Sequence, residues 1–210
     1  RCVVIDRRTH FGGNSYSYTD QKSGVEVHQY GSHLFHTSND QVWSFVNRFS
    51  EFNSYVHRVF TVHDEQVFSM PINLHTIGQF YGRVMSPDDA VATIKRDGRI
   101  PHPGKPRNLE EKAIESVGRP LYEALIRGYT RKQWNRDPSD LPASTISRLP
   151  VRLNYDSRYF NDKWEGLPVN GYGELFRRML DHPLISVELQ TDFSNVRGDV
   201  SNRLPVVYTG

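Results

Sequence analysis

Three prolines in the stretch from Gly128 to Phe160 place the strongest constraint on how this chain can fold. Pro138, Pro142 and Pro150 each lack a backbone donor and fix φ, so the stretch is predicted to be a shaped loop rather than one long helix. The stretch is also rich in aromatic rings, which can stack on a base or a sugar, and in guanidinium groups, which bind phosphate oxygens two at a time. These side chains are Tyr129, Trp134 and Tyr159, and Arg131, Arg136, Arg148, Arg152 and Arg158. Composition alone leaves two interpretations open: a site for a nucleotide diphosphate, or core aromatics with a solvated rim of arginines.

The composition of the chain limits its class. Its 210 residues are enough for one large domain or two small ones. No run approaches the roughly 20 apolar residues that span a bilayer, so membrane insertion is not expected. The 26 basic and 24 acidic residues give a net charge of only +2, which leaves no electrostatic footprint for nucleic acid. The single cysteine, Cys2, favours a reducing, cytoplasmic location and is predicted to be a small buried strand residue.

The chain opens with an apolar run, Cys2-Val3-Val4-Ile5, which is typical of a parallel strand covered on both faces. Asp6 follows at its carboxyl end, where an acidic residue of a dinucleotide-binding fold accepts hydrogen bonds from a ribose diol. Gly12 and Gly13 allow the backbone to approach a pyrophosphate closely, and Asn14 can cap or contact it. Taken alone, the glycine pair is better explained as a simple turn.

A strand followed by a helix is predicted next. Residues 25–30 alternate like a half-buried strand, and residues 38–41 form a capping-box sequence that opens a helix. His33 and His36 therefore lie in a strand-to-helix connection, the usual place for ligand contacts in such folds. No third ligand is spaced to complete a metal site with them, so no metal is expected. The apolar face of the helix is predicted to comprise Val42, Phe45, Val46 and Phe49.

The rest of the chain is predicted to contain a hairpin, several helices and a return to strands. The hairpin pairs residues 56–62 with residues 66–70. Capping signals predict helices that begin at Ser86, Asn108 and Pro120 and end at Gly98, Gly118 and Gly128. A helix near residues 174–180 and strands at 184–189 and 204–208 complete the chain.

Motifs that follow one another in the same order along the chain resemble those of the UDP-galactopyranose mutase family. They are Asp6-Arg7-Arg8-Thr9-His10-Phe11-Gly12-Gly13-Asn14, Tyr30-Gly31-Ser32-His33-Leu34-Phe35-His36-Thr37, Asn108-Leu109-Glu110-Glu111-Lys112-Ala113-Ile114, Gly128-Tyr129-Thr130-Arg131-Lys132-Gln133-Trp134, Arg148-Leu149-Pro150-Val151-Arg152, Tyr159-Phe160 and Tyr208-Thr209-Gly210. No single motif is decisive, but their shared order is hard to produce by chance. The resemblance covers essentially all 210 residues.

The two ends of the chain predict an internal fragment of such a protein. Arg1 opens directly into a strand, without the Gly-rich turn and helix that normally precede the second strand of a dinucleotide-binding unit. In the resembled family this turn lies before Arg1, and a second substrate-binding half lies after Gly210. We therefore expect the isolated chain to be inactive and not to retain FAD.

The resemblance implies an α/β fold: a partial Rossmann-like FAD-binding domain with a helical insertion and the start of an antiparallel-sheet substrate domain. The expected segments are 1–55, the first part of the FAD-binding domain; 56–70, a hairpin of the substrate-side sheet; 71–147, a helical domain with a mobile substrate loop; 148–180, a substrate-side sheet segment and helix; and 181–210, a return to the FAD-binding domain. The loop from Trp134 to Arg148 is expected to open easily, because few apolar side chains are available to anchor it.

The resemblance also implies an activity. A member of this family interconverts UDP-galactopyranose and UDP-galactofuranose with reduced FAD, through a covalent adduct between the sugar and flavin N5, and serves the synthesis of galactofuranose-containing cell-wall glycans. The full-length protein is expected to be a cytoplasmic homodimer that binds UDP-galactose. Two other classes stay open: an FAD-dependent oxidoreductase of the amine-oxidase type, and a non-catalytic nucleotide-sugar-binding fragment.

Residue roles follow from the matching motif positions. The expected catalytic residues are Arg148, which reaches the diphosphate, and His36, the imidazole nearest the flavin and the sugar. The expected cofactor-binding residues are Asp6, Arg7, Gly12, Gly13, Asn14, His33 and Leu34. The expected substrate-binding residues are His57, Tyr129, Thr130, Trp134, Arg148 and Tyr159. For His57, an exposed strand histidine without a substrate role remains the alternative.

Overall fold

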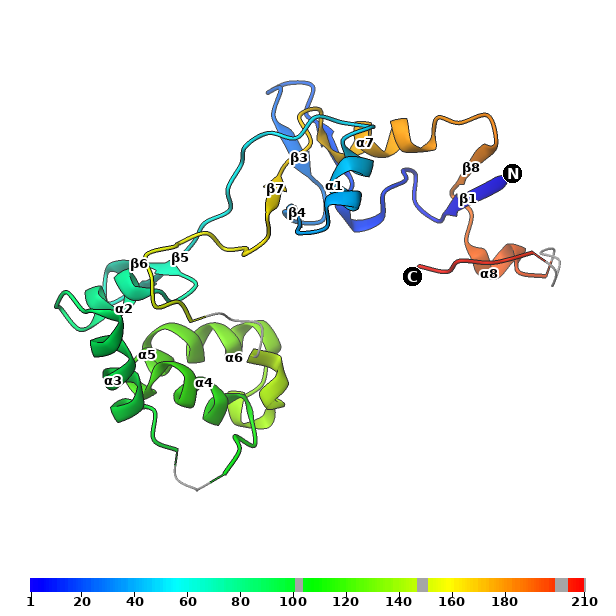
Figure 1. The fold of residues 1–210 in the computed structure, drawn as a ribbon. Helices are drawn as coiled ribbons and strands as arrows, with labels where there is room; N and C mark the ends of the chain where they lie inside the picture. Colours follow the sequence, from blue (N-terminus) through cyan, green and yellow to red (C-terminus); the bar gives the residue numbers. More distant parts are fainter. Residues whose placement is uncertain (101–103, 147–150, 199–203, 210) are drawn as a thin grey trace. The chain divides into compact units, whose positions relative to one another are not determined.

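The computed structural model describes residues 1–100, 104–146, 151–198 and 204–209. It divides into two compact units (Figure 1): unit 1 comprises Arg1–Tyr55 and Asp162–Gly210, and unit 2 comprises Val56–Asn161. Each unit is described by itself. Arg148 and Pro150 lie outside the described residues.

Unit 1 is built from short strand pairs. The first strand, β1 (Cys2–Asp6), pairs in parallel with β8 (Ile185–Leu189), so two segments from opposite ends of the sequence lie side by side (Figure 1). The antiparallel pairs are β2 (Ser17–Thr19) with β3 (Glu26–His28), and β4 (Phe35–Thr37) with β7 (Trp164–Gly166). The helices of the unit are η1 (Gly13–Ser15), α1 (Asp40–Val46), α7 (Gly171–Leu180) and α8 (Phe193–Val196).

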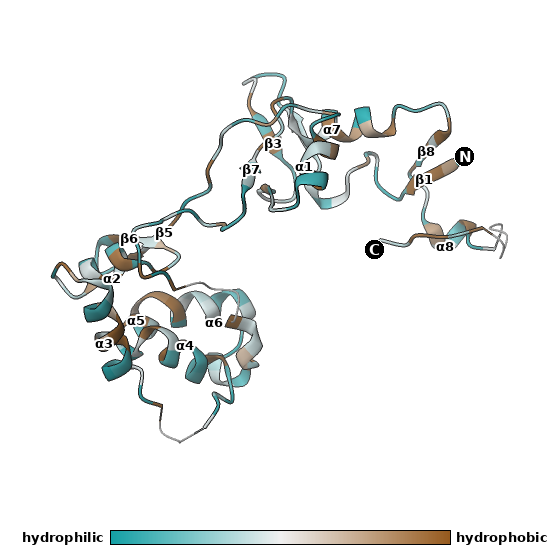
Figure 2. Cartoon of the chain, in the orientation of Figure 1, coloured by the Kyte–Doolittle hydropathy of each residue, from teal (hydrophilic) through white to brown (hydrophobic). Residues whose placement is uncertain are grey.

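The strand predictions for unit 1 are only partly confirmed. Strands β3 and β8 lie within the expected ranges, and β1 extends one residue beyond its range, to Asp6. The expectation that the first strand is covered on both faces is wrong, because Cys2 and Val3 are exposed and Val3 retains 55% of its accessible surface. Figure 2 shows the apolar residues along β1 and β8. Residues 204–208 were expected to form a strand, but no strand lies within the described residues 204–209, where no backbone ladder supports one.

Helix α1 differs from its prediction at its cap and on its apolar face. The N-cap is Asn39, whose side chain accepts from the backbone N–H groups of Gln41 and Val42. Ser38 does not cap the helix because its hydroxyl donates to Asp162. Of the predicted apolar face only Val46 is buried, and the helix ends there.

Unit 2 begins with a hairpin. Strand β5 (Val59–His63) pairs antiparallel with β6 (Gln66–Met70), which confirms the predicted hairpin but starts its first strand three residues later than residue 56. The two turn residues, Asp64 and Glu65, have φ of 46° and 62°. Positive φ at both central positions matches the right-handed twist of the strands, as in type I′ turns.

Helices form most of unit 2. They are α2 (Leu74–Phe80), α3 (Pro87–Asp97), α4 (Leu109–Val117), α5 (Arg119–Leu121), the π-helical segment η2 (Tyr122–Arg127), α6 (Gly128–Trp134), and the 3₁₀ turns η3 (Pro138–Asp140) and η4 (Ala143–Ile146). Their apolar sides form one large buried cluster, which comprises Phe68, Ile72, Leu74, Ile77, Met85, Ala90, Leu109, Ala113, Ile114, Val117, Leu121, Tyr122, Leu125, Ile126, Leu141 and Ile146. Unit 2 therefore has a hydrophobic core of its own.

Local capping explains the two best-predicted helices. Ser86 and Asp89 form a reciprocal capping box at the start of α3, Pro87 occupies its first turn, and Gly98 ends it, as predicted. Asn108 caps α4 through the backbone N–H of Glu111, and Gly118 ends this helix. The second half of the predicted capping box at α4 is replaced, because the Glu111 carboxylate accepts from the backbone and guanidinium of Arg107.

The prediction that a helix ends at Gly128 is wrong. The chain stays helical through Gly128, which has φ of −62°, and α6 ends at Trp134, before Asn135 in the left-handed conformation. Residues 128–134 are therefore a helix rather than part of a loop. The first of the three prolines, Pro138, lies beyond the last turn of α6, so none of them removes a hydrogen bond from this helix.

Residues 135–146 are held by the core of unit 2. Leu141 and Ile146 belong to the buried cluster, and the backbone N–H of Leu109 donates to the Leu141 carbonyl at 2.9 Å. The expectation that few apolar side chains anchor this segment is therefore wrong for residues 135–146. Whether the loop that contains Arg148 opens and closes stays a prediction.

Candidate functional site

The carboxyl end of β1 carries the first of the predicted cofactor residues. The Asp6 carboxylate accepts from the backbone N–H of Arg8 at 2.9 Å, and the Asp6 carbonyl accepts from the backbone N–H of Thr191 at 3.0 Å. Arg7 is exposed beside it. Open α/β sheets bind ligands outside the carboxyl ends of their parallel strands, and Asp6 lies at this edge of the β1–β8 pair.

The glycine pair forms a tight turn against α7. Gly12 and Gly13 have φ of 92° and 57°, a conformation that side chains rarely adopt. A Cβ atom on Gly12 would lie 2.5 Å from the ring of Phe176 in α7, so the turn also needs glycine for close packing. Asn14 lies in the next turn, and its side-chain oxygen accepts from the Arg8 guanidinium at 2.8 Å.

An aromatic group beside this turn was not predicted as part of the site. The Arg8 guanidinium lies 4.7 Å from the centre of the Tyr30 ring. His10 stacks on Tyr16 with 3.9 Å between ring centres, and its Nε2 lies 2.8 Å from the Tyr30 hydroxyl. Arg8, His10 and Tyr30 stand in the motifs that carry the family resemblance, so the signal was present, but the sequence does not show that they meet.

His33 and Leu34 lie in the connection between strands β3 and β4, whereas the sequence predicted a connection from a strand to a helix at His33. The backbone N–H of His33 donates to Nδ1 of His28 at 3.1 Å, and its own Nδ1 lies 2.9 Å from the Gly31 carbonyl. Leu34 is half-buried. The turn at Gly31 is thus fixed by two histidine rings.

His36 differs from its prediction, because it is the middle residue of strand β4 rather than part of a loop. Its Nδ1 lies 2.6 Å from the Asp162 carboxylate, which also accepts from the Ser38 hydroxyl at 2.7 Å. The Ser38 hydrogen bond, and then the His36 ring, hold the pKa of Asp162 below its usual value. An ionised carboxylate at Nδ1 fixes the tautomer and orientation of the imidazole.

The two aromatic residues predicted to contact the nucleotide project from α6. Tyr129 and Trp134 retain 68% and 53% of their accessible surface. They are five residues apart, so they lie on different sides of the helix. Thr130, between them, is buried and faces the core of unit 2.

His57 and Tyr159 are brought together although about a hundred residues separate them in the sequence. The backbone N–H of Tyr159 donates to the His57 carbonyl at 2.8 Å, and the two rings meet edge to face with 5.4 Å between their centres. His57 is half-buried and precedes β5, which begins at Val59. The two predicted substrate residues thus form one ring pair.

The arginines of this region have different partners. Arg131 pairs with Asp137 at 3.2 Å, and Arg158 pairs with Asp156 at 2.9 Å. Arg136 is exposed, whereas Arg152 is buried among backbone carbonyls. Their shared role as phosphate ligands is therefore not supported for Arg152.

Two further findings concern the residues that the structure describes. None of their helices is long and apolar enough to cross a membrane. In the same part of the chain, no group of three or more His, Cys, Asp or Glu side chains is arranged to hold a metal ion.

The fold and the turn after β1 define the class as a Rossmann-like dinucleotide-binding protein. Residues 1–49 match the family model of the NAD(P)-binding Rossmann-like domain, and residues 124–210 match the family model of UDP-galactopyranose mutase. The resemblance to the UDP-galactopyranose mutase family is thereby confirmed, and so is the predicted α/β fold with a Rossmann-like domain.

Individual relatives agree with the family match. The chain is 50% identical over 192 residues to a probable UDP-galactopyranose mutase of Klebsiella pneumoniae, with 90% of this chain and 49% of that protein covered. It is 45% identical over 188 residues to a dTDP-fucopyranose mutase of Escherichia coli, with coverages of 89% and 49%. A crystal structure of reduced UDP-galactopyranose mutase has a TM-score of 0.65 at 16% identity, covering 88% of this chain and 42% of that one, which supports the fold. The chain thus spans about half the length of the curated relatives it matches.

Proposed function

We propose that the full-length protein is a flavin-dependent isomerase that interconverts UDP-galactopyranose and UDP-galactofuranose. The observation that carries the proposal is the 50% identity, over 90% of this chain, to a probable UDP-galactopyranose mutase. The alternative of an amine-oxidase-type oxidoreductase shares the dinucleotide-binding turn but has no need for exposed aromatics at Tyr129 and Trp134.

The residues after β1 fit a dinucleotide such as FAD. The Asp6 carboxylate can accept from a ribose diol, and the left-handed turn at Gly12 and Gly13 leaves the backbone accessible to phosphate oxygens. The Arg8 guanidinium lies 3.6 Å from a Cβ position on Gly13, so a cation stands beside the turn. When bound, reduced FAD would supply the nucleophile for the anomeric carbon, its N5 atom, with UDP as the leaving group.

The side chains of the chain hold UDP and stabilise its charge as it leaves. Tyr129 would stack on the uracil, and Trp134 would lie against the uridine and the sugar. The phenol of Tyr159 would bind a phosphate oxygen. His36, oriented by Asp162, would contribute an imidazole of fixed orientation near the flavin and the sugar.

The substrate is tested by measuring both directions of sugar interconversion with the full-length protein. With dithionite present, UDP-galactofuranose should be converted to UDP-galactopyranose, and product separation by anion-exchange chromatography measures the rate. Without reductant the rate should be far lower. Equal rates for oxidised and reduced protein would contradict the role of flavin N5.

A second candidate substrate is favoured by the relative of Escherichia coli named a dTDP-fucopyranose mutase. Fucose lacks the 6-hydroxyl group of galactose, and thymine carries a methyl group that uracil lacks. The ratio of kcat/KM for UDP-galactopyranose and dTDP-fucopyranose decides between them, since specificity is a ratio of these values. A ratio that favours the dTDP-sugar would keep the class of reaction and replace the substrate.

Arg148 is the residue that we propose to bind the diphosphate during the reaction. A guanidinium on the departing pyrophosphate stabilises the transition state more than the ground state. Arg148→Ala should therefore lower kcat/KM about a hundredfold or more, as expected for the loss of one transition-state charge contact. Steady-state kinetics of the reduced full-length enzyme measure this effect. Normal turnover by the variant would exclude the role.

The proposal extends to a cytoplasmic homodimer that serves the synthesis of galactofuranose-containing cell-wall glycans. The single cysteine of these 210 residues, Cys2, is consistent with a reducing compartment. Light scattering on the purified full-length protein measures the oligomeric state, and a monomer mass would contradict the dimer.

A further inference from the structure

Arg152 is a buried cation whose backbone is tied to the core of unit 2. Only 8% of its accessible surface remains. Its backbone N–H donates to the carbonyl of Ile72, a member of the buried cluster, at 3.0 Å. Burying a charged side chain is costly unless its donors are satisfied, so the partners of the guanidinium indicate why it is there.

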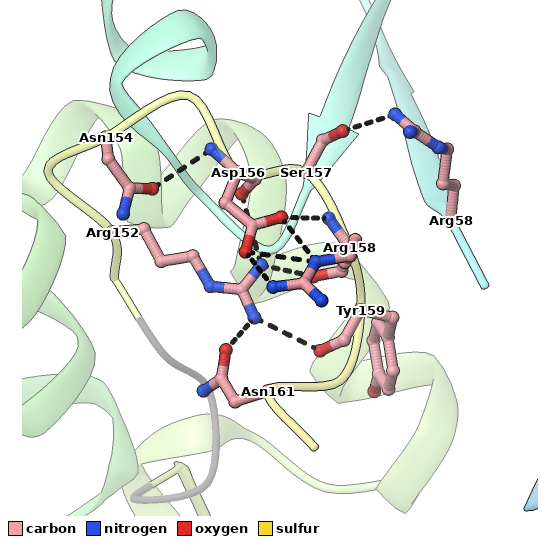
Figure 3. A network of polar contacts seen from close by, with 8 residues as sticks. All are labelled: Arg58, Arg152, Asn154, Asp156, Ser157, Arg158, Tyr159 and Asn161. Carbon is pink, nitrogen blue, oxygen red and sulfur yellow. Dashed lines mark hydrogen bonds and ion pairs between the residues drawn. The ribbon is translucent and has the colours of Figure 1, made fainter. Parts of the chain in front are cut away.

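The guanidinium is surrounded by one loop, which we define as residues 154–161 (Figure 3). Nη1 donates to the backbone carbonyl of Asp156 at 3.1 Å and to the carbonyl of Arg158. Nη2 donates to the side-chain oxygen of Asn161 and lies 3.5 Å from the Tyr159 carbonyl. One planar group thus serves four acceptors of the loop, a geometry that a lysine ammonium cannot reproduce.

The other charged groups of the loop do not take over this role. Arg158 forms its ion pair with Asp156, and Arg58 donates from outside the loop to the Ser157 hydroxyl at 2.6 Å. Figure 3 shows the contact between Arg58 and Ser157 on the outer side of the loop, whereas the Arg152 side chain reaches into its inner side. The curvature of the loop therefore depends on Arg152.

Tyr159 is the residue whose position this network determines. Its carbonyl faces Arg152, and its N–H donates to His57. Its ring meets the rings of His57 and Phe160 edge to face, at 5.4 and 5.1 Å between centres. The exposed phenol is thus presented from a backbone that is held on both sides.

We propose that Arg152 is a positioning residue for nucleotide-diphosphate binding: it holds the loop 154–161 so that Tyr159 and His57 present one fixed ring pair to the ligand. Arg152 itself contacts no ligand, in contrast to the interpretation, left open by composition alone, in which it binds phosphate oxygens. The inference rests on the proposed function in so far as UDP is the ligand. Small displacements of a binding group are costly, because an error of about 1 Å can reduce activity by about a hundredfold.

A double-mutant cycle with the full-length protein tests this inference. The variants are Arg152→Lys, which keeps the charge, and Arg152→Met, which keeps an unbranched apolar stem but removes the charge and the donors, each made with and without Tyr159→Ala. Calorimetric titration with UDP gives the Kd. Arg152→Lys and Arg152→Met should each raise Kd about tenfold when Tyr159 is present and less than about twofold when Tyr159 is replaced, since residues that act through each other are not additive. Equal losses in both backgrounds, or no loss in either, would overturn the inference.

Hydrogen exchange separates this inference from the proposed function. In Arg152→Lys the amide of Tyr159 should exchange at least about tenfold faster, while the amides of α4 keep their rates, because only the loop is released. The matched control is Arg58→Met, which removes another guanidinium that contacts the same loop and should leave both the Tyr159 amide and the Kd for UDP within about twofold of wild type. An unchanged Tyr159 amide in Arg152→Lys would refute the positioning role even if the protein bound no UDP. Failure of the wild-type protein to bind UDP would instead count against the proposed function. If Arg152→Met does not fold, the cycle is completed with Arg152→Lys alone.

Discussion

Unit 1 and unit 2 differ in how they bury apolar side chains. The large buried cluster runs from Phe68 to Ile146 and belongs entirely to unit 2. Among the described residues of unit 1, the buried apolar side chains are Val46, Pro168, Tyr172 and Leu175. Burial of apolar area is the main favourable contribution to folding, so unit 2 is expected to be the more stable of the two.

Distant segments of unit 1 are joined by polar contacts as well as by stacked aromatic rings such as Trp43 and Trp164. Asp162 joins His36 and Ser38, and Asp40 accepts from both Lys163 and the Trp164 indole N–H. Each such hydrogen bond contributes only about 0.5–1.5 kcal/mol net. The predicted cofactor residues therefore lie in a unit whose distant segments are joined by polar contacts, whereas the predicted substrate residues lie in a unit with a large apolar core.

The largest expected effect comes from removing apolar side-chain volume, which should destabilise unit 2 more than unit 1. Leu121→Ala creates a cavity in the core of unit 2 and should lower the free energy of unfolding by about 2–5 kcal/mol. Val3→Ala, at an exposed position of unit 1, should cost less than about 1 kcal/mol. Urea unfolding of the full-length variants measures both changes. Similar losses would mean that the two units do not differ in this way.

Two glycines, one in each unit, differ in how closely other atoms pack against their backbone. In unit 1, Gly173→Ala would bring a Cβ to 2.5 Å from the Ser17 carbonyl oxygen, so a loss of about 1–3 kcal/mol is expected. In unit 2, Gly128 is helical and nothing lies within 4 Å of its Cβ position. Gly128→Ala should therefore stabilise the protein by about 0.4–1 kcal/mol, because alanine restricts the unfolded chain. Melting curves that show the same sign for both variants would contradict this difference.

Within unit 2, substitution of an exposed aromatic residue should change UDP binding without a large change in stability. Trp134→Ala should weaken UDP binding by about 1–3 kcal/mol if the indole stacks on the nucleotide. The melting temperature should change little, because Trp134 is half exposed on α6 and lies outside the buried cluster. Calorimetric titration and thermal unfolding of the full-length variant give the two values. A large loss of stability with unchanged UDP affinity would assign Trp134 to the core instead.

The smallest expected effect concerns pH. The Arg158 side chain, and then its backbone N–H, lower the pKa of Asp156 from 3.8 to about 2. Because the folded state favours the ionised carboxylate, this contribution to stability is complete above about pH 4 and is lost as the pH falls toward 2. The pair is solvent-exposed, so its contribution should be below about 1 kcal/mol. Unfolding of wild type and Asp156→Asn between pH 2 and 6 measures it; a constant difference over this range would exclude the linkage.

Local signals explain which parts of the fold could be predicted. Helix α3 starts at a Ser86 capping box and ends at Gly98, and both ends are encoded by adjacent residues. At Gly128 the same kind of signal failed, since glycine also adopts ordinary helical φ and nothing in the sequence fixes which conformation it takes. Tertiary packing decides such cases.

The candidate site was predicted as a set of residues but not as a set of contacts. The family resemblance identified His36, His57 and Tyr159, yet the partner of His36 is Asp162, which is 126 residues away in the sequence. No local pattern marks Asp162 as that partner. Arg152 likewise belongs to a motif rich in arginine, and only its burial distinguishes a guanidinium that binds backbone carbonyls from one that faces solvent.

The π-helical segment η2 sets the rotational phase of α6. Residues in a π-helix bond from i to i+5, so this segment takes up extra residues relative to an α-helix over the same length. One residue more or less rotates everything that follows by about 100° around the helix axis. Shortening 122–127 by one residue would turn α6 by that angle, which would move Thr130 out of the core and change the directions in which Tyr129 and Trp134 project. The number of residues in this one segment thus determines the directions in which the aromatic side chains of α6 project.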